Sequence, residues 1–242
     1  MVDYLILILL HLVGDFYLQT TKIAQCKNAR KSYTCGKCKK CKDNSWINIR
    51  YLLIHSLLYA IPFVTLCFIT NYIYTTVVMV ILLVTHILID IVTCYFNKRF
   101  KQTLVFILDQ AIHIGIICFI PRFLIFKHNL NDYYGLLKVI FVCLMLIMPS
   151  SVMISKLIKD IYPNTEDMGV FDIGSMIGIM ERFLAVIFAY FNNFPAIAII
   201  ITVKTWARTN DLKEPEFRNK YLLGTLTSLV LALLIFIVYE LL

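Results

Sequence analysis

The sequence predicts an all-α fold, a polytopic bundle of transmembrane helices with about eight spans in a single domain, residues 1–242. The chain is 60% hydrophobic with a mean hydropathy of +0.79, whereas soluble domains are about 45–50% apolar. Apolar segments of about 17–25 residues, the length that crosses a bilayer, recur along most of the chain. Basic residues gather in alternate connections between these segments, as orientation signals do. The lipid bilayer is therefore the first partner that the sequence predicts.

The predicted spans follow one another with short connections. In chain order they are residues 3–20, 48–69, 72–96, 103–121, 135–153, 170–191, 194–208 and 220–240. The seventh has the shortest uninterrupted apolar core, Ala196 to Val203. Pro149, near the end of the fifth, is expected to kink or end that helix because proline has no N–H to donate.

Charge predicts the orientation of the bundle. Lysines and arginines follow the first, third, fifth and seventh spans, and with eight spans all of these connections lie on one side. That side is expected to be cytoplasmic, with both termini outside, in the inner membrane of a cell. The net charge of +8 is explained by this asymmetry, so nucleic acid is not an expected partner. Nothing in the sequence indicates an oligomeric state.

Ionisable side chains inside the spans form the most informative pattern. His86 and Asp90 are four residues apart, as are Asp109 and His113, so each pair shares one helix face. The first predicted span repeats this spacing with His11 and Asp15. Such residues are costly within a membrane and indicate function by default.

Four predicted spans place these groups at similar depth. At about 1.5 Å per residue their distances from the cytoplasmic ends agree to within a turn or two. We refer to the set as the His/Asp layer; it comprises His11, Asp15, His55, His86, Asp90, Asp109 and His113. Imidazole nitrogen with carboxylate oxygen is the ligand set of zinc, manganese and non-haem iron. The layer is thus expected to hold a divalent metal, zinc or manganese, with hydrogen bonding between helices as the alternative.

Several motifs resemble those of an uncharacterised family of bacterial multi-pass membrane proteins, known as a domain of unknown function. They are HLVGDFYLQT, LLIHSLLY, THILIDIV, FILDQAIH, IGIMERFL, VKTWAR and KYLLGTLTS. The early His and Gly-Asp pattern is also similar to membrane-bound metal-dependent hydrolases. The first resemblance implies a membrane fold without an activity, and the second implies metal-dependent hydrolysis. The cysteine-rich insert after the first span departs from the family pattern.

Charged residues of the sixth and seventh spans are candidates for a catalytic role. Glu181 and Arg182 are adjacent near mid-span, so they point in different directions and each needs its own partner. Lys204 and Arg208 are four residues apart and share a face. Metal with Arg and Lys is an arrangement that binds and activates phosphoryl groups. The three cations are expected to receive an anionic headgroup and Glu181 to act as general acid or base; snorkelling of Lys204 and Arg208 is the alternative.

The insert at residues 22–45 contains four cysteines with the spacing C-x8-C-x2-C-x2-C. On a cytoplasmic side disulfides are disfavoured, so this spacing favours a structural zinc site, with an iron–sulfur cluster or idle thiols as alternatives. The cysteines are Cys26, Cys35, Cys38 and Cys41. The surrounding lysines make the loop a candidate for contact with anionic lipid or, as the less favoured alternative, nucleic acid. A cytoplasmic protein is a further possible partner of the loop.

Three functions follow from these patterns. The first is an intramembrane metal-dependent hydrolase acting on a phosphate-containing or lipid substrate, with water as the nucleophile because no G-x-S-x-G motif is present. The second is a transporter or channel that moves protons or metal ions through the same layer. The third is a membrane anchor or sensor that recruits a partner through the cysteine loop.

Overall fold

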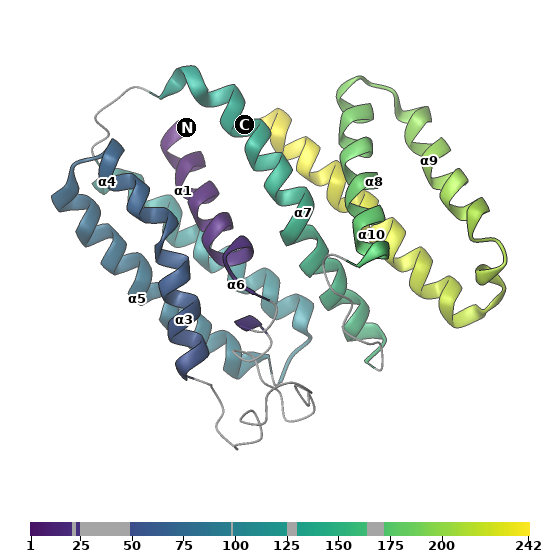
Figure 1. Ribbon diagram of the computed structural model, residues 1–242, viewed down its shortest axis with the longest axis horizontal. Coiled ribbons are helices and arrows are strands. Elements are labelled where there is room, and N and C mark those ends of the chain that lie inside the picture. Colours follow the sequence, from purple (N-terminus) through teal and green to yellow (C-terminus); the bar gives the residue numbers. More distant parts are fainter. Residues whose placement is uncertain (21–22, 25–48, 98, 125–129, 164–171) are drawn as a thin grey trace. The chain divides into compact units, whose positions relative to one another are not determined.

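The computed structural model describes residues 1–20, 23–24, 49–97, 99–124, 130–163 and 172–242. Within these ranges the secondary structure is helical (Figure 1). The chain divides into two compact units, Met1–Leu137 and Lys138–Leu242. The predicted His/Asp layer belongs to the first unit, and the charged residues of the sixth and seventh predicted spans belong to the second.

The first unit is a cluster of helices around α5. Helix α5 packs against α3 and α6, while α1 packs against α6 and its π-helical continuation η1 packs against α3. The elements are α1 (Val2–Leu12), η1 (Val13–Tyr17), α3 (Ile49–Ala60), η3 (Pro62–Thr65), α4 (Leu66–Ile69), α5 (Tyr72–Phe96), α6 (Gln102–Phe119), η4 (Ile120–Phe123) and η5 (Asn131–Tyr133). Four helices therefore surround one interior, as the predicted layer requires.

An apolar core occupies one end of that interior. Its buried members come from α1, α3, η3, α4, α5, α6 and η4, and from Leu124 directly after η4. They are Leu7, Tyr59, Phe63, Leu66, Val78, Leu82, Ile117, Ile120 and Leu124. The Tyr59 ring stacks on His86 with 3.8 Å between ring centroids, so the core ends directly against the polar layer.

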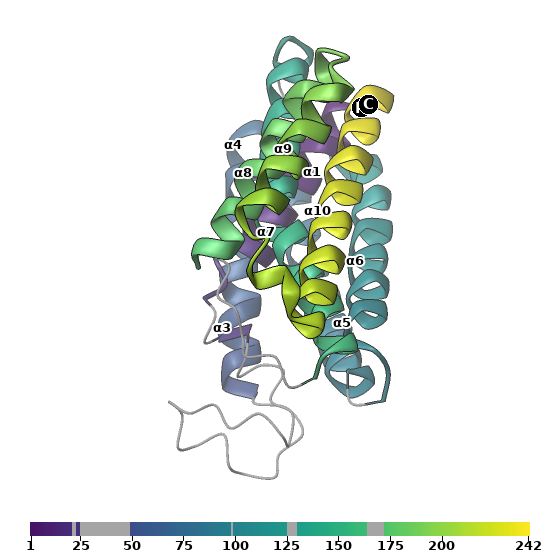
Figure 2. The same cartoon turned by 90° about the vertical axis from the view of Figure 1, so that its right-hand side faces the viewer.

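In the second unit, helices that follow one another in the chain run in opposite directions (Figure 1). Helix α8 packs against α9 and α10, and Figure 2 shows these three side by side. The elements are α7 (Tyr134–Ile161), which begins just before the unit boundary, α8 (Ile173–Tyr190), α9 (Phe194–Ala207), η6 (Asp211–Lys213) and α10 (Pro215–Leu241). Asp172 caps α8, because its Oδ1 accepts a hydrogen bond from the Ser175 N–H at 2.7 Å.

Helix α7 runs through Pro149 to Ile161 instead of ending near the proline. Pro149 cannot donate to the Met145 carbonyl, and the Ser150 hydroxyl donates to that oxygen instead, at 2.7 Å. Because the freed carbonyl is satisfied, the helix continues. Of the two effects expected of Pro149, the helix end is wrong, whereas the kink stays a prediction.

Helices occupy all eight predicted segments, and in the described part of the chain six helical segments are long and apolar enough to cross a membrane. These are Ile49–Ile69, Ile73–Phe96, Gln102–Phe119, Asn131–Ile161, Ile173–Tyr190 and Pro215–Leu241. Helix α9 is shorter, with 14 residues. The all-α fold is confirmed, whereas the number of spans and the outside position of the termini stay predictions.

Candidate metal centre

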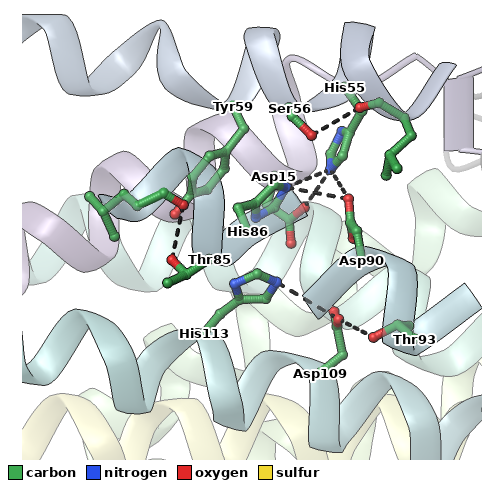
Figure 3. A network of polar contacts seen from close by, with 12 residues as sticks. Asp15, His55, Ser56, Tyr59, Thr85, His86, Asp90, Thr93, Asp109 and His113 are labelled. Atoms are coloured by element: carbon green, nitrogen blue, oxygen red, sulfur yellow. Dashed lines mark hydrogen bonds and ion pairs between the residues drawn. The ribbon is translucent and has the colours of Figure 1, made fainter. Parts of the chain in front are cut away.

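Six residues of the predicted layer come together in the first unit as two groups of three (Figure 3). Within each group the three ligand atoms lie within 4.8 Å of one another. The A group is Asp15, His55 and His86, and the B group is Asp90, Asp109 and His113. Helices far apart in the sequence therefore supply one polar centre.

The A group is the tighter of the two. His55 Nε2 lies 3.0 Å from His86 Nε2 and 3.2 Å from Asp15 Oδ1. Two nitrogens bound tetrahedrally to one zinc at about 2.0–2.1 Å would be roughly 3.3 Å apart. The spacing of the two imidazoles is thus close to that of ligands on a common ion.

Asp90 of the B group lies next to the A group. Its Oδ2 is 3.5 Å from His55 Nε2 and 3.6 Å from His86 Nε2. On α6, His113 Nε2 lies 3.8 Å from Asp109 Oδ1, and the Thr93 hydroxyl donates to the same oxygen at 2.7 Å. The two groups are therefore continuous through Asp90.

His11 lies beside the two groups instead of in either of them. Its Nδ1 is 3.3 Å from the Tyr59 hydroxyl and its Nε2 is 3.3 Å from Gln110 Oε1. Gln110 donates from Nε2 to Asp15 Oδ2 at 2.8 Å and to Asp109 Oδ2 at 3.1 Å. With its amide nitrogen turned toward two carboxylates, the Gln110 oxygen must accept from His11. His11 thus supports the ligands through Gln110.

Six of the seven residues of the layer are buried, and Asp109 is partly exposed. His11 and His55 are 0% exposed, His86 is 1%, Asp90 is 2% and His113 is 3% exposed. Burying a charged carboxylate is costly unless a cation or several hydrogen bonds compensate for the lost water. Three carboxylates in this small volume require such compensation.

The π-helical turn η1 and a close helix contact position Asp15. A Cβ built on Gly14 would lie 2.7 Å from the Tyr59 carbonyl oxygen, so only glycine allows η1 to approach α3 this closely. π-helical turns are rare and often occur at functional sites. Sequence reasoning missed the roles of Gly14, Tyr59 and Thr93. Tyr59 carried a usable signal, because it follows His55 by four residues.

In the second unit, Glu181 and Arg182 have separate partners, as their adjacency predicted. Lys204 Nζ donates to Glu181 Oε2 at 2.5 Å. The Arg208 guanidinium lies over the Phe217 ring, 5.9 Å from its centroid. These contacts lie within the second unit, and the catalytic roles of the four charged residues stay predictions.

Arg182 is bound on three sides. Its Nε donates to the Leu146 carbonyl at 2.7 Å, its Nη2 to the Ser151 hydroxyl at 2.7 Å, and its Nη1 to the Ser228 hydroxyl at 3.1 Å. The guanidinium thereby links α8 to α7 and α10. Its contacts are those of a structural cross-link between helices.

The cysteines of the predicted zinc site lie outside the described residues. They are Cys26, Cys35, Cys38 and Cys41. Zinc binding by this insert stays a prediction.

The fold and the layer define a class of protein: a helical protein with apolar helices of membrane-spanning length and a buried His/Asp cluster suited to a metal ion. The chain matches the family described as "Protein of unknown function (DUF3307)" over residues 4–138. This is more than half of the chain, so the protein belongs to that family, and the predicted resemblance to an uncharacterised family is confirmed. The match nearly coincides with the first unit and contains all six residues of the A and B groups. No curated protein and no solved structure matches the chain.

Proposed function

We propose that the protein is a membrane-embedded, metal-dependent hydrolase whose centre is the His/Asp layer, acting on a phosphate-containing or lipid substrate. The metal would be a divalent ion, zinc or manganese, because the donor set combines imidazole and carboxylate. The observation that carries the proposal is the surroundings of a single atom, His55 Nε2.

Three ligand atoms crowd around that nitrogen. His86 Nε2 lies at 3.0 Å, Asp15 Oδ1 at 3.2 Å and Asp90 Oδ2 at 3.5 Å. A ring nitrogen carries at most one proton, so His55 Nε2 can donate a hydrogen bond to only one of these three atoms at a time. A cation among them would be attracted to every lone pair. Metal binding therefore explains the convergence better than interhelical hydrogen bonding does.

The proposed chemistry is activation of water. A divalent ion with an open coordination position lowers the pKa of bound water to about 7, which supplies a nucleophile at neutral pH. The chain contributes the ligands, and Gln110 with Thr93 holds two of the carboxylates in place. The apolar core beside Tyr59 excludes bulk water from one end of the site.

The first test is the metal content of the purified full-length protein. The protein would be compared with a His86→Ala/Asp90→Ala variant, using Asp132→Ala, a change at an exposed aspartate, as the matched control. We expect the double variant to lose the divalent metal of the layer, while the control keeps it and both keep any zinc held by the cysteine insert. Equal metal content in all three proteins would overturn the metal centre.

A second measurement separates hydrolysis from transport. The protein would be reconstituted into vesicles containing an anionic phospholipid, with a metal-sensitive dye inside one preparation and a pH-sensitive dye inside a second. Metal-dependent release of a hydrolysis product, lost in the double variant, is the expected result. Passage of metal ions or protons across the vesicle membrane without hydrolysis would replace the hydrolase with the transporter.

A further inference from the structure

We propose that the layer holds two metal ions, one in the A group and one in the B group, with Asp90 between them, and that its substrate is a phosphate ester. This inference rests on the proposed metal-dependent function. It adds the number of ions and the substrate class to that function.

Ligand number is the first argument. Each group offers three protein ligand atoms, and the two groups share no residue. Catalytic zinc sites have three protein ligands and keep the fourth position for water or substrate. A single ion bound by all six residues would have no position left for a reacting molecule. Two ions with three ligands each would both remain open.

The surroundings of His113 indicate that the B group can bind an ion of its own. Its side chain is buried, and its Nε2 has no hydrogen-bond partner in the described part of the chain. Asp109 Oδ1, at 3.8 Å, is beyond hydrogen-bond distance but within reach through a shared cation. His113 Nε2 is therefore a buried nitrogen next to two carboxylates, which is the environment of a metal ligand.

Asp90 has the position of a bridging carboxylate. It belongs to the B group, yet its Oδ2 is 3.5 Å from His55 Nε2 and 3.6 Å from His86 Nε2 of the A group. Gln110 makes a second link, because its amide binds the outer oxygens of Asp15 and Asp109. The two groups are thus held at a fixed separation by α5 on one side and Gln110 on the other.

Charge gives an independent argument. The two groups together contain three carboxylates, so one divalent ion would leave a net charge of about −1 in a buried site. Two ions would leave about +1 with neutral imidazoles. A positive remainder attracts an anion, and a phosphate group supplies oxygens that can lie against both ions. Two-metal sites are well suited to in-line displacement at phosphorus.

The reaction would be hydrolysis of a phosphate ester. A carboxylate of the layer accepts one proton from water as the water oxygen bonds to phosphorus. The ester P–O bond breaks, its electron pair leaves with the ester oxygen, and that oxygen takes up the proton. The products are an alcohol and a phosphate, and no oxidant or further reactant is needed.

Manganese is the probe for the number of ions, because it prefers carboxylate and imidazole over the thiolates of the cysteine insert. The full-length protein would be dialysed against excess Mn²⁺, and its bound Mn²⁺ counted and examined by electron paramagnetic resonance. We expect two ions per chain with a spin-coupled spectrum. An Asp109→Asn/His113→Ala variant and an Asp15→Asn/His55→Ala variant should each keep one ion and show the spectrum of an isolated ion.

The count on the unmodified protein needs no variant and so decides the inference even if a variant fails to fold. One ion per chain, with an isolated-ion spectrum, would overturn the two-metal centre and leave the proposed function standing. Absence of any ion in the layer would overturn both.

The substrate class is tested with the manganese-loaded protein. When inorganic phosphate binds, the paramagnetic Mn²⁺ ions should broaden its ³¹P resonance. This broadening should decrease in both double variants. Hydrolysis of phosphatidic acid in vesicles would identify a lipid phosphate as the source, and hydrolysis of p-nitrophenyl phosphate would identify a soluble ester. Absence of phosphate binding to a protein with two ions would overturn the phosphate-ester assignment.

Discussion

Both units bury ionic side chains, but they compensate for the lost water in opposite ways. In the second unit Arg182 is 3% exposed, and each of its three nitrogens donates to a neutral oxygen. In the first unit His55 Nε2 faces three ligand atoms with one proton at most. Three nitrogens of the arginine thus have protein acceptors, whereas one imidazole nitrogen of the layer has three possible ligand atoms around it.

This difference provides a criterion for separating a buried charge that cross-links helices from a buried cluster that could bind a ligand. Burial alone does not separate them, since both regions are shielded. The balance between hydrogen-bond donors and acceptors separates the two cases. An excess of acceptor lone pairs indicates a bound cation, whereas donors that all have acceptors indicate cross-linking of helices. From the sequence, Arg182 and the histidines were both candidates for a functional site. Their contacts in the structure differ.

Replacing Arg182 with alanine should have the largest effect on stability. The change removes three hydrogen bonds that Arg182 donates to oxygens of α7 and α10. A hydrogen bond to a charged group contributes about 1.5–3 kcal/mol. We expect a loss of that order in the free energy of unfolding in detergent, with the metal content per folded chain unchanged.

Arg218→Ala is the matched control, because Arg218 is exposed on the same helix bundle; its effect should lie within about 0.5 kcal/mol. If Arg182→Ala abolished hydrolysis while the unfolding curve stayed unchanged, Arg182 would not be a structural cross-link between helices. Arg182 would then have the catalytic role that the sequence suggested.

In the first unit, replacing Gly14 with alanine should have an intermediate effect on stability. A Cβ at this position would lie 2.7 Å from the Tyr59 carbonyl, so η1 must move away from α3. Overpacking of this kind costs about 1–3 kcal/mol, and it displaces Asp15. We expect lower unfolding free energy together with weaker Mn²⁺ binding, measured by equilibrium dialysis.

Gly115→Ala provides the control on α6, since a Cβ there meets nothing within 4 Å. Alanine is favoured over glycine within a helix by roughly 0.5–1 kcal/mol, so this variant should be as stable as the parent or slightly more so. Unchanged Mn²⁺ binding in Gly14→Ala would show that the close contact does not position the ligand.

Much of the first unit was predictable because hydrophobic length and i, i+4 spacing are local properties. The segments that hold His55, His86 and His113 were predicted as helices, and the ligand pairs on α5 and α6 followed from spacing alone. The division into A and B groups was not predictable, because it depends on how four helices rotate against one another. The role of His11 depends on the same packing, since the Gln110 amide lies between His11 and the ligands.

The second unit illustrates a different limit. Pro149 suggested a helix end, and only the Ser150 hydroxyl shows why α7 continues. A hydroxyl that replaces a missing N–H is specified by side-chain rotamer, not by residue spacing. The cationic character of Arg182 was visible in the sequence, but the oxygens that bind it come from residues more than thirty positions away.

The smallest effect is expected at the ion pair between Glu181 and Lys204. Both side chains are 19% exposed, and partly exposed pairs contribute about 0.2–1 kcal/mol. A double-mutant cycle with Glu181→Gln and Lys204→Met should therefore give a coupling energy below about 1 kcal/mol in unfolding experiments. Both variants should retain two Mn²⁺ ions, since neither residue is among the ligands of the first unit. If Glu181→Gln instead stopped hydrolysis with stability and metal content intact, Glu181 would be the general acid or base, and the second unit would take part in the chemistry as well as in packing.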